Sequence, residues 1–207
     1  ELQIPKFKDK EVGIVICNSI FFNADKKEKI LYKNKPKEGY VFRDLLKAYN
    51  ISLETAIIRK SYLVNLNDWF DNRFEVIEEF DLFIRLSKIC KLSYVDEILA
   101  KWRVHSSSWT WQRKDLFPKE TRLFIKKIMK DIPETKSKYK DSLETLMNNV
   151  IYQEFLIKWE QNNNKIERKD LNSIKFKSKK FLIIYILSFI LPFKIFNYLN
   201  NKRQLLY

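Results

Sequence analysis

Carboxylates gather in one short stretch of this basic chain. Glu78 and Glu79 stand side by side in the segment RFEVIEEFDLFIRLSKICK, and Asp81 follows two places later. The single histidine, His105, comes 26 residues after Glu79, directly behind Trp-Arg-Val. A carboxylate in a cleft can take a proton from a hydroxyl group, and an imidazole can move protons or hold a metal ion. These residues are therefore the candidates for acid–base chemistry.

The spacing of the acids indicates a helix with one polar stripe. At about 100° per residue, a helix that begins near Glu78 places Glu78, Asp81 and Arg85 on the same side. Asp81 and Arg85 are spaced i, i+4, which suits a helical ion pair. Glu79 lies off this stripe, in the first turn. Apolar side chains cover most of the remaining surface: Phe80, Phe83, Ile84, Leu86 and Ile89.

Two interpretations of Glu79 compete. Acids favour the first turn of a helix because the helix dipole stabilises negative charge there. Alternatively, a first-turn carboxylate that points into a cleft stays ionised and acts as a general base. Spacing alone favours the first interpretation.

The residues around His105 allow similar alternatives. A lone histidine in a serine-rich stretch, here HSSSWTW, is more often a structural hydrogen-bonding group than a metal ligand. Trp102, Trp109 and Trp111 either belong to a core or offer flat, partly exposed apolar surfaces on which a sugar ring can stack.

Composition limits the classes of protein to consider. The chain has 207 residues, of which 45% are hydrophobic and 15% aromatic, so a sizeable core is expected rather than disorder. Gly13 and Gly39 are its only glycines, so no glycine-rich phosphate-binding motif is present. Cys17 and Cys90 are far apart and form no Cys-x-x-Cys motif, which disfavours a disulfide framework or zinc site and fits a reducing cytoplasm.

The net charge of +14 lies mostly in the second half. Residues 1–112 hold 19 basic and 16 acidic side chains, whereas residues 113–207 hold 21 and 10. Three explanations remain open: binding of nucleic acid, contact with anionic lipid, or a compositional habit in which Lys, Asn and Ile are all abundant.

The first half alternates strand and helix, which predicts an α/β domain over residues 1–112. We expect strands at 11–23 and 92–105, the latter broken by a turn at Asp96-Glu97. We expect a polar loop or charged hairpin at 23–40, a short amphipathic helix at 40–50, and at 51–64 a strand that turns into a helix capped by Ser61.

The second half, 113–207, predicts a basic helical extension. Residues 113–160 show helical periodicity and indicate two helices joined across Pro133, followed by a polar connector at 162–180. The apolar segment 181–199 has an uninterrupted run shorter than the roughly 20 residues that span a bilayer. We expect Pro192 to end or kink it, and the helix to lie at a membrane interface or on the core.

Three segments in order resemble the C-terminal, acceptor-side half of a family-2-type glycosyltransferase with the GT-A fold. In that family, G-x-hydrophobic-x-x-L-L and T-x-x-I-R-(K/R) precede F-(D/N)-x-x-F, then an acidic pair before (Y/F)-D-L-x-x-R-L, then Y-R-x-H-x-x-S. The match covers about residues 39–108, with weaker support back to the strand at 11–22. The segments are GYVFRDLLKAYNISLETAIIRKSYL, WFDNRFEVIEEFDLFIRLS and YVDEILAKWRVHSSSWT.

The resemblance implies transfer of a sugar from a nucleotide-sugar to an acceptor hydroxyl, usually with inversion. Glu79 stands where the family has its catalytic base, usually Asp, and Glu78 is its neighbour. Asp81 and Arg85 match the supporting D and R. His105 matches a histidine near the diphosphate that helps some relatives bind a divalent cation, which would be Mg²⁺ or Mn²⁺.

The resemblance also guides the choice of partners. Trp102, where the family often has Tyr, and Trp109 are the candidates for binding a glycan or lipid-linked acceptor. The family's nucleotide-binding half, with its Asp-x-Asp metal motif, would precede residue 1, so we expect little nucleotide-sugar binding by this chain alone. The implied fold for 1–112 is a partial GT-A-type mixed sheet with flanking helices.

The implied role is synthesis of a cell-surface polysaccharide or glycolipid, in the cytoplasm or peripherally at the inner face of the cell membrane. An apolar helix at 181–191 flanked by basic residues suits an anionic membrane surface, or else it covers the domain's own core. The flanking residues are Lys179, Lys180, Lys194, Lys202 and Arg203.

Two other classes of function remain. One is a catalytically inactive module that binds a glycan or a partner chain. The other is a basic nucleic-acid-binding protein, which we disfavour because the positive charge lies in helices and a connector without a recognition motif. We therefore expect no nucleic acid among the partners.

Overall fold

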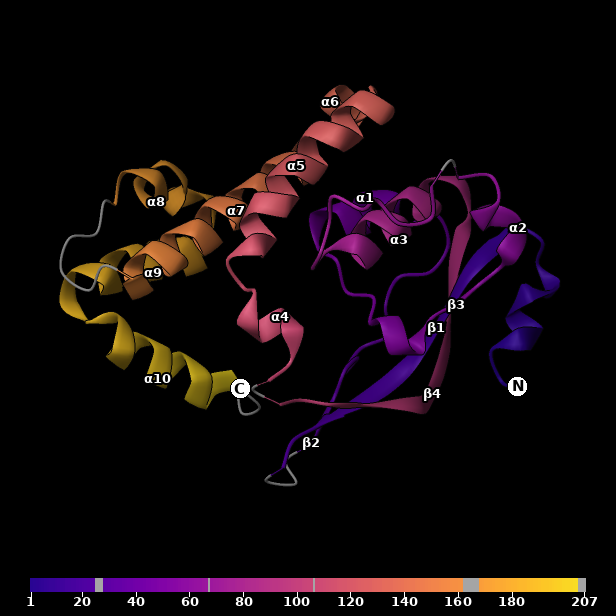
Figure 1. The fold of residues 1–207 in the computed structure, drawn as a ribbon, viewed down its shortest axis with the longest axis horizontal. Helices are drawn as coiled ribbons and strands as arrows, with labels where there is room; N and C mark the ends of the chain where they lie inside the picture. The colour runs from indigo at the N-terminus through magenta and orange to yellow at the C-terminus, as the bar shows by residue number, and fades with distance from the viewer. Residues whose placement is uncertain (25–27, 67, 106, 162–167, 205–207) are drawn as a thin grey trace. The chain divides into compact units, whose positions relative to one another are not determined.

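The computed structural model of the chain describes residues 1–24, 28–66, 68–105, 107–161 and 168–204. The chain divides into two compact units at the junction of Gln112 and Arg113 (Figure 1). The first unit combines a mixed sheet with flanking helices, and the second is helical. The expected α/β class with a C-terminal helical region is confirmed.

The sheet of the first unit is built around β1 (Val12–Phe22). β4 (Lys91–Arg103) pairs with it in parallel along its whole length. Because β4 occupies one edge, β2 (Glu28–Ile30) and β3 (Ile57–Ile58) pair antiparallel with the other edge, near its two ends. The first eight residues of β1 are all buried, as in a strand covered on both faces. The predicted first strand and charged hairpin are confirmed.

Helices cover one face of this sheet. α1 (Phe42–Lys47) and α3 (Glu78–Ile89) pack on each other, and α3 also contacts β1 (Figure 1). On the other face, Phe7 from the 3₁₀ helix η1 (Ile4–Lys8) packs against a small buried cluster. That cluster consists of Val12, Val15, Cys17 and Val95.

A close approach requires glycine at the start of β1. A Cβ added to Gly13 would lie 2.3 Å from Cys90 Sγ and 2.8 Å from a ring carbon of Tyr62. Cys90 directly follows α3, so the missing side chain lets the end of that helix seat against the sheet. Gly39 is different, because its φ of 89° is a backbone conformation that other residues rarely adopt.

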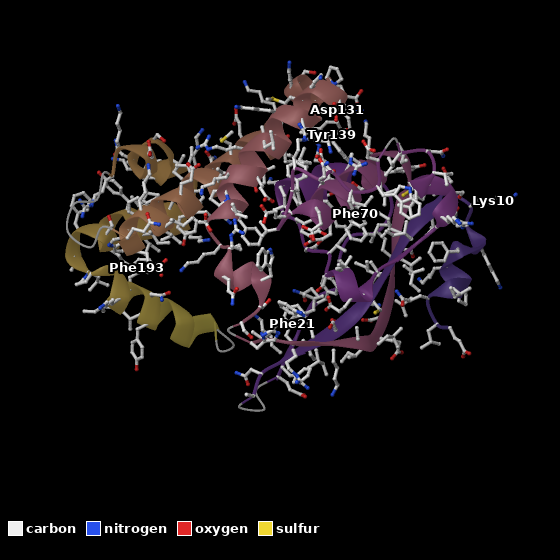
Figure 2. All side chains as sticks on the ribbon, viewed as in Figure 1. Lys10, Phe21, Phe70, Asp131, Tyr139 and Phe193 are labelled. Atoms are coloured by element: carbon white, nitrogen blue, oxygen red, sulfur yellow. The ribbon has the colours of Figure 1, made fainter. Side chains whose placement is uncertain are left out.

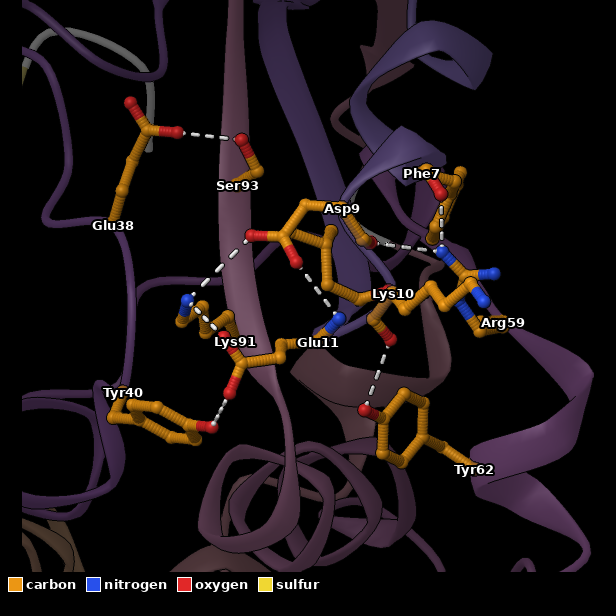
Figure 3. Close-up of polar contacts among 11 residues, drawn as sticks. Phe7, Asp9, Lys10, Glu11, Glu38, Tyr40, Arg59, Tyr62, Lys91 and Ser93 are labelled. Carbon is orange, nitrogen blue, oxygen red and sulfur yellow. Dashed lines mark hydrogen bonds and ion pairs between the residues drawn. The ribbon is translucent and has the colours of Figure 1, made fainter.

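Polar contacts fasten the chain's first residues to the sheet (Figure 3). The Lys91 ammonium group lies 2.5 Å from a Glu11 oxygen and 3.5 Å from an Asp9 oxygen, and the Tyr40 hydroxyl donates to Glu11 at 2.8 Å. These hydrogen bonds, led by that from Lys91, lower the pKa of Glu11. Arg59 donates to the carbonyl groups of Phe7, Asp9 and Val12. The network joins η1 and β1 to β4 and to the segment before α2.

Two predicted details of the first unit are wrong. α2 (Lys60–Leu63) begins one residue before Ser61, behind an extended Arg59 that caps through no side chain. The strand after α3 is not broken by a turn at Asp96-Glu97 but runs through as β4 with shifts of register near these residues. An irregularity of this kind bends a strand, and β4 bends midway in Figure 1. Two acids that suggested a turn therefore mark a bulge.

The remaining elements of the first unit are two short ones. η2 (Leu53–Thr55) is a 3₁₀ helix beside β1 and β4, so the strand expected at the start of 51–64 is present only as the later, shorter β3. α4 (Trp109–Gln112) is a single turn that closes the unit.

The second unit is a packed set of helices. α5 (Leu116–Asp131) packs along α7 (Lys140–Gln161), and the turn at Pro133 and the short α6 (Thr135–Lys138) join them. The expected two helices are confirmed.

The predicted connector at 162–180 is wrong in its second part. Residues 162–167 lie outside the described residues, but α8 (Lys169–Ile174) and the 3₁₀ helix η3 (Lys175–Lys177) follow. Leu171 and Ile174, spaced i, i+3, are buried in the core and give this lysine-rich stretch its helical face.

The end of the described chain forms α9 (Lys179–Ile190) and α10 (Phe193–Gln204). Pro192 separates them, as predicted, because proline cannot donate the hydrogen bond that would continue α9. Within the described residues, none of the helices combines the length and the apolar character needed to cross a bilayer.

Candidate functional site

The first turn of α3 carries the acids, and one of them is fully satisfied. Asp81 is completely buried, and one of its oxygens accepts from Arg85 Nε at 2.9 Å, with Nη2 at 2.8 Å. The predicted i, i+4 ion pair is therefore present. Burial of a charged pair is tolerated only when its remaining hydrogen-bonding capacity is also used.

Arg85 uses that capacity to hold a loop. Its two terminal nitrogens donate to the carbonyl oxygens of Asp68 and Trp69, each at 2.8 Å. The ion pair thus fixes the segment before α3 against the helix. The side chains of Trp69 and of its neighbour Phe70 are about half exposed. Phe70 is labelled in Figure 2.

Sequence reasoning missed Trp69 and Phe70 as candidate binding residues. Their signal is the pair of adjacent aromatic residues in the polar stretch NDWFDN, where a core would not be expected. The sequence does not show that Arg85, 16 residues later, holds this loop by a hydrogen bond to the Trp69 carbonyl group.

Glu79 lies partly buried, one position off the ion-paired stripe. Burial raises its pKa to about 6 from a usual 4.5, its own backbone N–H lowers the pKa somewhat, and the charge of Glu78 raises it further. At neutral pH the carboxylate is therefore mostly ionised and still basic enough to accept a proton.

Two buried polar atoms beside Glu79 have no hydrogen-bond partner among the described residues. They are Oε2 of Glu78 and the hydroxyl of Tyr49. The Tyr49 ring packs edge-on against Phe80, with ring centres 5.1 Å apart. Burial raises the pKa of Tyr49, and the negative charge of Glu79 raises it further. Because buried polar groups are nearly always paired, the two unpaired atoms single out this group of three side chains as the candidate site.

The tryptophans predicted for the site differ from each other. Trp102 on β4 is half-buried and packs edge-on against Phe21 of β1, with ring centres 4.9 Å apart. Much of its surface thus serves packing. Trp109 on α4 is 54% exposed.

His105 follows β4 and is exposed. Its Nδ1 lies 3.0 Å from the hydroxyl of Ser107. Over the described part of the chain, no three side chains of the metal-binding types gather around one point. His105 would supply at most one ligand, so the residues present do not fit a complete Mg²⁺ or Mn²⁺ site, and we derive no reaction step through a metal ion.

The structure brings some of the predicted residues together. Glu78, Glu79, Asp81 and Arg85 share the first two turns of α3, with Tyr49 beside the two glutamates. Trp102, His105 and Trp109 lie at and beyond the end of β4, and no contact between them and the acids of α3 is seen among the described residues.

Comparison with known proteins adds no family. No protein-family model matches the chain, and no curated protein matches it in sequence. The glycosyltransferase relation accordingly remains a resemblance of ordered motifs.

Proposed function

We propose that the first unit is the acceptor-side half of a GT-A-type glycosyltransferase. It would transfer a sugar from a nucleotide-sugar to an acceptor hydroxyl, in the synthesis of a cell-surface polysaccharide or glycolipid. The observation that carries the proposal is the group formed by Glu79, Glu78 and Tyr49, which includes buried polar atoms that lack partners among the described residues. It lies at the start of a helix whose other acid is fully paired.

In this proposal Glu79 acts as the general base. The acceptor oxygen forms a bond to the anomeric carbon, the bond from that carbon to the diphosphate breaks, and the hydroxyl proton moves to the Glu79 carboxylate. A pKa of about 6 suits this role, because the group is mainly ionised at neutral pH and retains an affinity for protons. Glu78 and Tyr49 contribute polar atoms that can orient the acceptor.

Asp81 and Arg85 act as positioning residues. The Arg85 guanidinium of this ion pair holds Asp68 and Trp69 by their backbone carbonyl groups, which fixes the segment that carries Trp69 and Phe70 against α3. Exposed, rigidly held aromatic rings suit the C–H face of a sugar. The donor and any divalent cation would be held mainly by a nucleotide-binding half outside residues 1–112.

A second candidate is a glycan-binding module without catalysis. The exposed aromatic side chains Trp69, Phe70 and Trp109 favour it, since stacking on sugars needs no base. The two candidates differ in what Glu79 does.

The test is a transfer assay on the protein as its gene encodes it, with a panel of nucleotide-sugars and oligosaccharide acceptors. Glu79→Gln removes the base while keeping size and shape, and we expect transfer to fall about 10²–10⁴-fold. Glu97→Gln, an exposed acid on β4, is the matched control and should retain full activity. Undiminished turnover in Glu79→Gln would remove Glu79 from the base role.

Acceptor binding separates the two candidates. For the transferase, Trp69→Ala weakens oligosaccharide binding measured by NMR titration, and Glu79→Gln leaves it nearly unchanged while transfer is lost. For the binding module, both variants alter affinity and no nucleotide-sugar is consumed by the wild type.

A further inference from the structure

α9 is apolar on every side, yet the second unit covers only one of its faces. Its sequence is KKFLIIYILSFI, without a charge after the first two residues. Phe181, Ile184 and Ser188, spaced i, i+3, i+7, are buried on the core side. Two of them pack in the cluster that contains the fully buried Trp159. This face accounts for the attachment of α9 to its own unit.

The opposite face carries a second apolar stripe. Ile183, Ile186 and Ile190 show the same spacing, and Ile183 and Ile190 are 54% and 68% exposed. Phe189 lies beside them and is exposed as well. α10 adds further exposed apolar side chains after Pro192: Ile195, Tyr198 and Leu199.

Such a surface calls for a partner. A helix that is apolar all round is normally buried on all sides, and a continuous exposed apolar patch usually marks an interaction surface. The exposed stripe of α9 therefore needs an occupant that is itself apolar.

Lysines flank α9 in the sequence on both sides and narrow the choice of an apolar partner. η3 and the start of α9 read KFKSKK. Phe176 in this stretch is 80% exposed, more than any other large apolar side chain of the described residues. The Lys175 ammonium group lies 5.0 Å from the centre of the Phe176 ring and 4.8 Å from that of Tyr185 on α9. Lys194 is exposed at the start of α10.

We propose that this surface docks on an anionic lipid bilayer. We call it the α9–α10 surface, made of Phe176, Ile183, Ile186, Phe189, Ile190, Ile195, Tyr198 and Leu199. The apolar side chains would enter the boundary between headgroups and acyl chains, and the lysines would contact lipid phosphates. α9 would lie in the plane of the membrane, consistent with the described helices, none of which could cross it.

Charge decides between a bilayer and a second copy of the chain. Residues 113–207 carry 21 basic and 10 acidic side chains, so two copies placed face to face would repel each other. An anionic membrane offers acyl chains to the apolar stripe and phosphate groups to the lysines. The inference does not depend on the transferase proposal, because it uses only residues of the second unit.

The first experiment is flotation of the whole chain with vesicles of phosphatidylcholine, with and without phosphatidylserine. We expect binding to the anionic vesicles only, and loss of binding as salt is raised, since the lysine contribution is screened. The double variant Ile183→Gln, Ile190→Gln should bind about tenfold more weakly or worse, because it removes the apolar contact. Ile98→Gln on β4 changes an isoleucine of similar exposure in the first unit and serves as the control.

A fluorescent label reports the orientation. Cys17 and Cys90 are buried, so an environment-sensitive dye on Phe189→Cys reacts selectively at that position. We expect its emission to shift to the blue on anionic vesicles, and the same dye on Ile98→Cys to remain unshifted.

Three results would overturn the inference. They are equal partitioning of wild type and the double variant, an unshifted dye at position 189, and a wild-type dimer that the double variant converts to monomer without any vesicle binding. Circular dichroism and an unchanged melting temperature establish that each variant is folded.

Discussion

α3 in the first unit and α9 in the second are both 12 residues long, but α3 is buried around most of its circumference, whereas α9 packs one face on a core. They leave opposite kinds of groups unsatisfied. α3 buries an ion pair that is hydrogen-bonded, whereas one oxygen of Glu78 on this helix and the nearby hydroxyl of Tyr49 are buried without a partner among the described residues. α9 instead exposes isoleucine side chains to water, where apolar surface is unfavourable. Unpartnered polar groups point to a polar ligand, and uncovered apolar groups point to an apolar one.

The largest expected effect breaks the ion pair of α3. Asp81→Ala leaves the Arg85 charge partly buried without its carboxylate, and the chain should lose about 3–5 kcal/mol of unfolding free energy. Asp115→Ala removes a pair of the same i, i+4 spacing on α5, with Lys119 Nζ at 2.9 Å but both side chains exposed. That change should stay within about 1 kcal/mol. Urea unfolding measures both, and equal losses would contradict the comparison.

The next effect contrasts the two faces of α9. Ile184→Ala opens a cavity in the core of the second unit and should cost about 2–5 kcal/mol. Ile183→Ala, one residue earlier on the exposed face, should change stability by no more than about 0.5 kcal/mol. Thermal unfolding of the two variants measures the difference. Similar losses would mean that both faces are packed.

A smaller effect tests how closely α3 seats on the sheet. Gly13→Ala forces a methyl group to within 2.3 Å of Cys90 Sγ, so the strand or the helix end must move, at a cost of about 1–3 kcal/mol. Gly39→Ala meets no neighbour within 4 Å but keeps a φ of 89°, which should cost about 1 kcal/mol. Chemical unfolding distinguishes them. If Gly13→Ala did not change the free energy of unfolding, Cys90 would have moved aside at little cost.

The smallest effect depends on pH. The pKa of Glu79 is raised in the folded state to about 6 from 4.5, so the folded protein binds the proton more tightly. Its contribution to stability is present below pH 4.5 and is lost as the pH rises through about 6. Glu79→Gln should therefore have the same free energy of unfolding as the wild type in acid. Above this pH window its free energy of unfolding should be larger by about 1 kcal/mol, which is half of what the full pKa shift would give, because the group is partly exposed. Melting temperatures across the pH range test the sign, and a variant less stable at neutral pH would contradict it.

Much of the local structure could be predicted from residue patterns. The start of α3 at Glu78, the strand around Val15 and the break at Pro192 follow from helical periodicity, β-branched runs and proline chemistry, all of which act over a few residues. The ion pair of Asp81 with Arg85 followed for the same reason. These features need no knowledge of the rest of the chain.

The failures share a different cause. Asp96-Glu97 was expected to form a turn, but the parallel pairing with β1 carries the strand through as a bulge. The role of Trp69 depends on a hydrogen bond from Arg85, 16 residues away. The helical face of α8 depends on a core that receives Leu171. Each is decided by contacts between distant segments, which local propensity does not encode.

By itself the sequence determined a mixed first half, a basic helical second half, and the residue types available for acid–base chemistry and lipid contact, because composition and periodicity express what short segments prefer. Only the tertiary structure decided that Asp81 is paired while Glu78 keeps a buried oxygen without a partner among the described residues, and that Ile184 faces the core while Ile183 faces outward. Burial and pairing are properties of the assembled chain, since each depends on which distant groups displace water from a side chain.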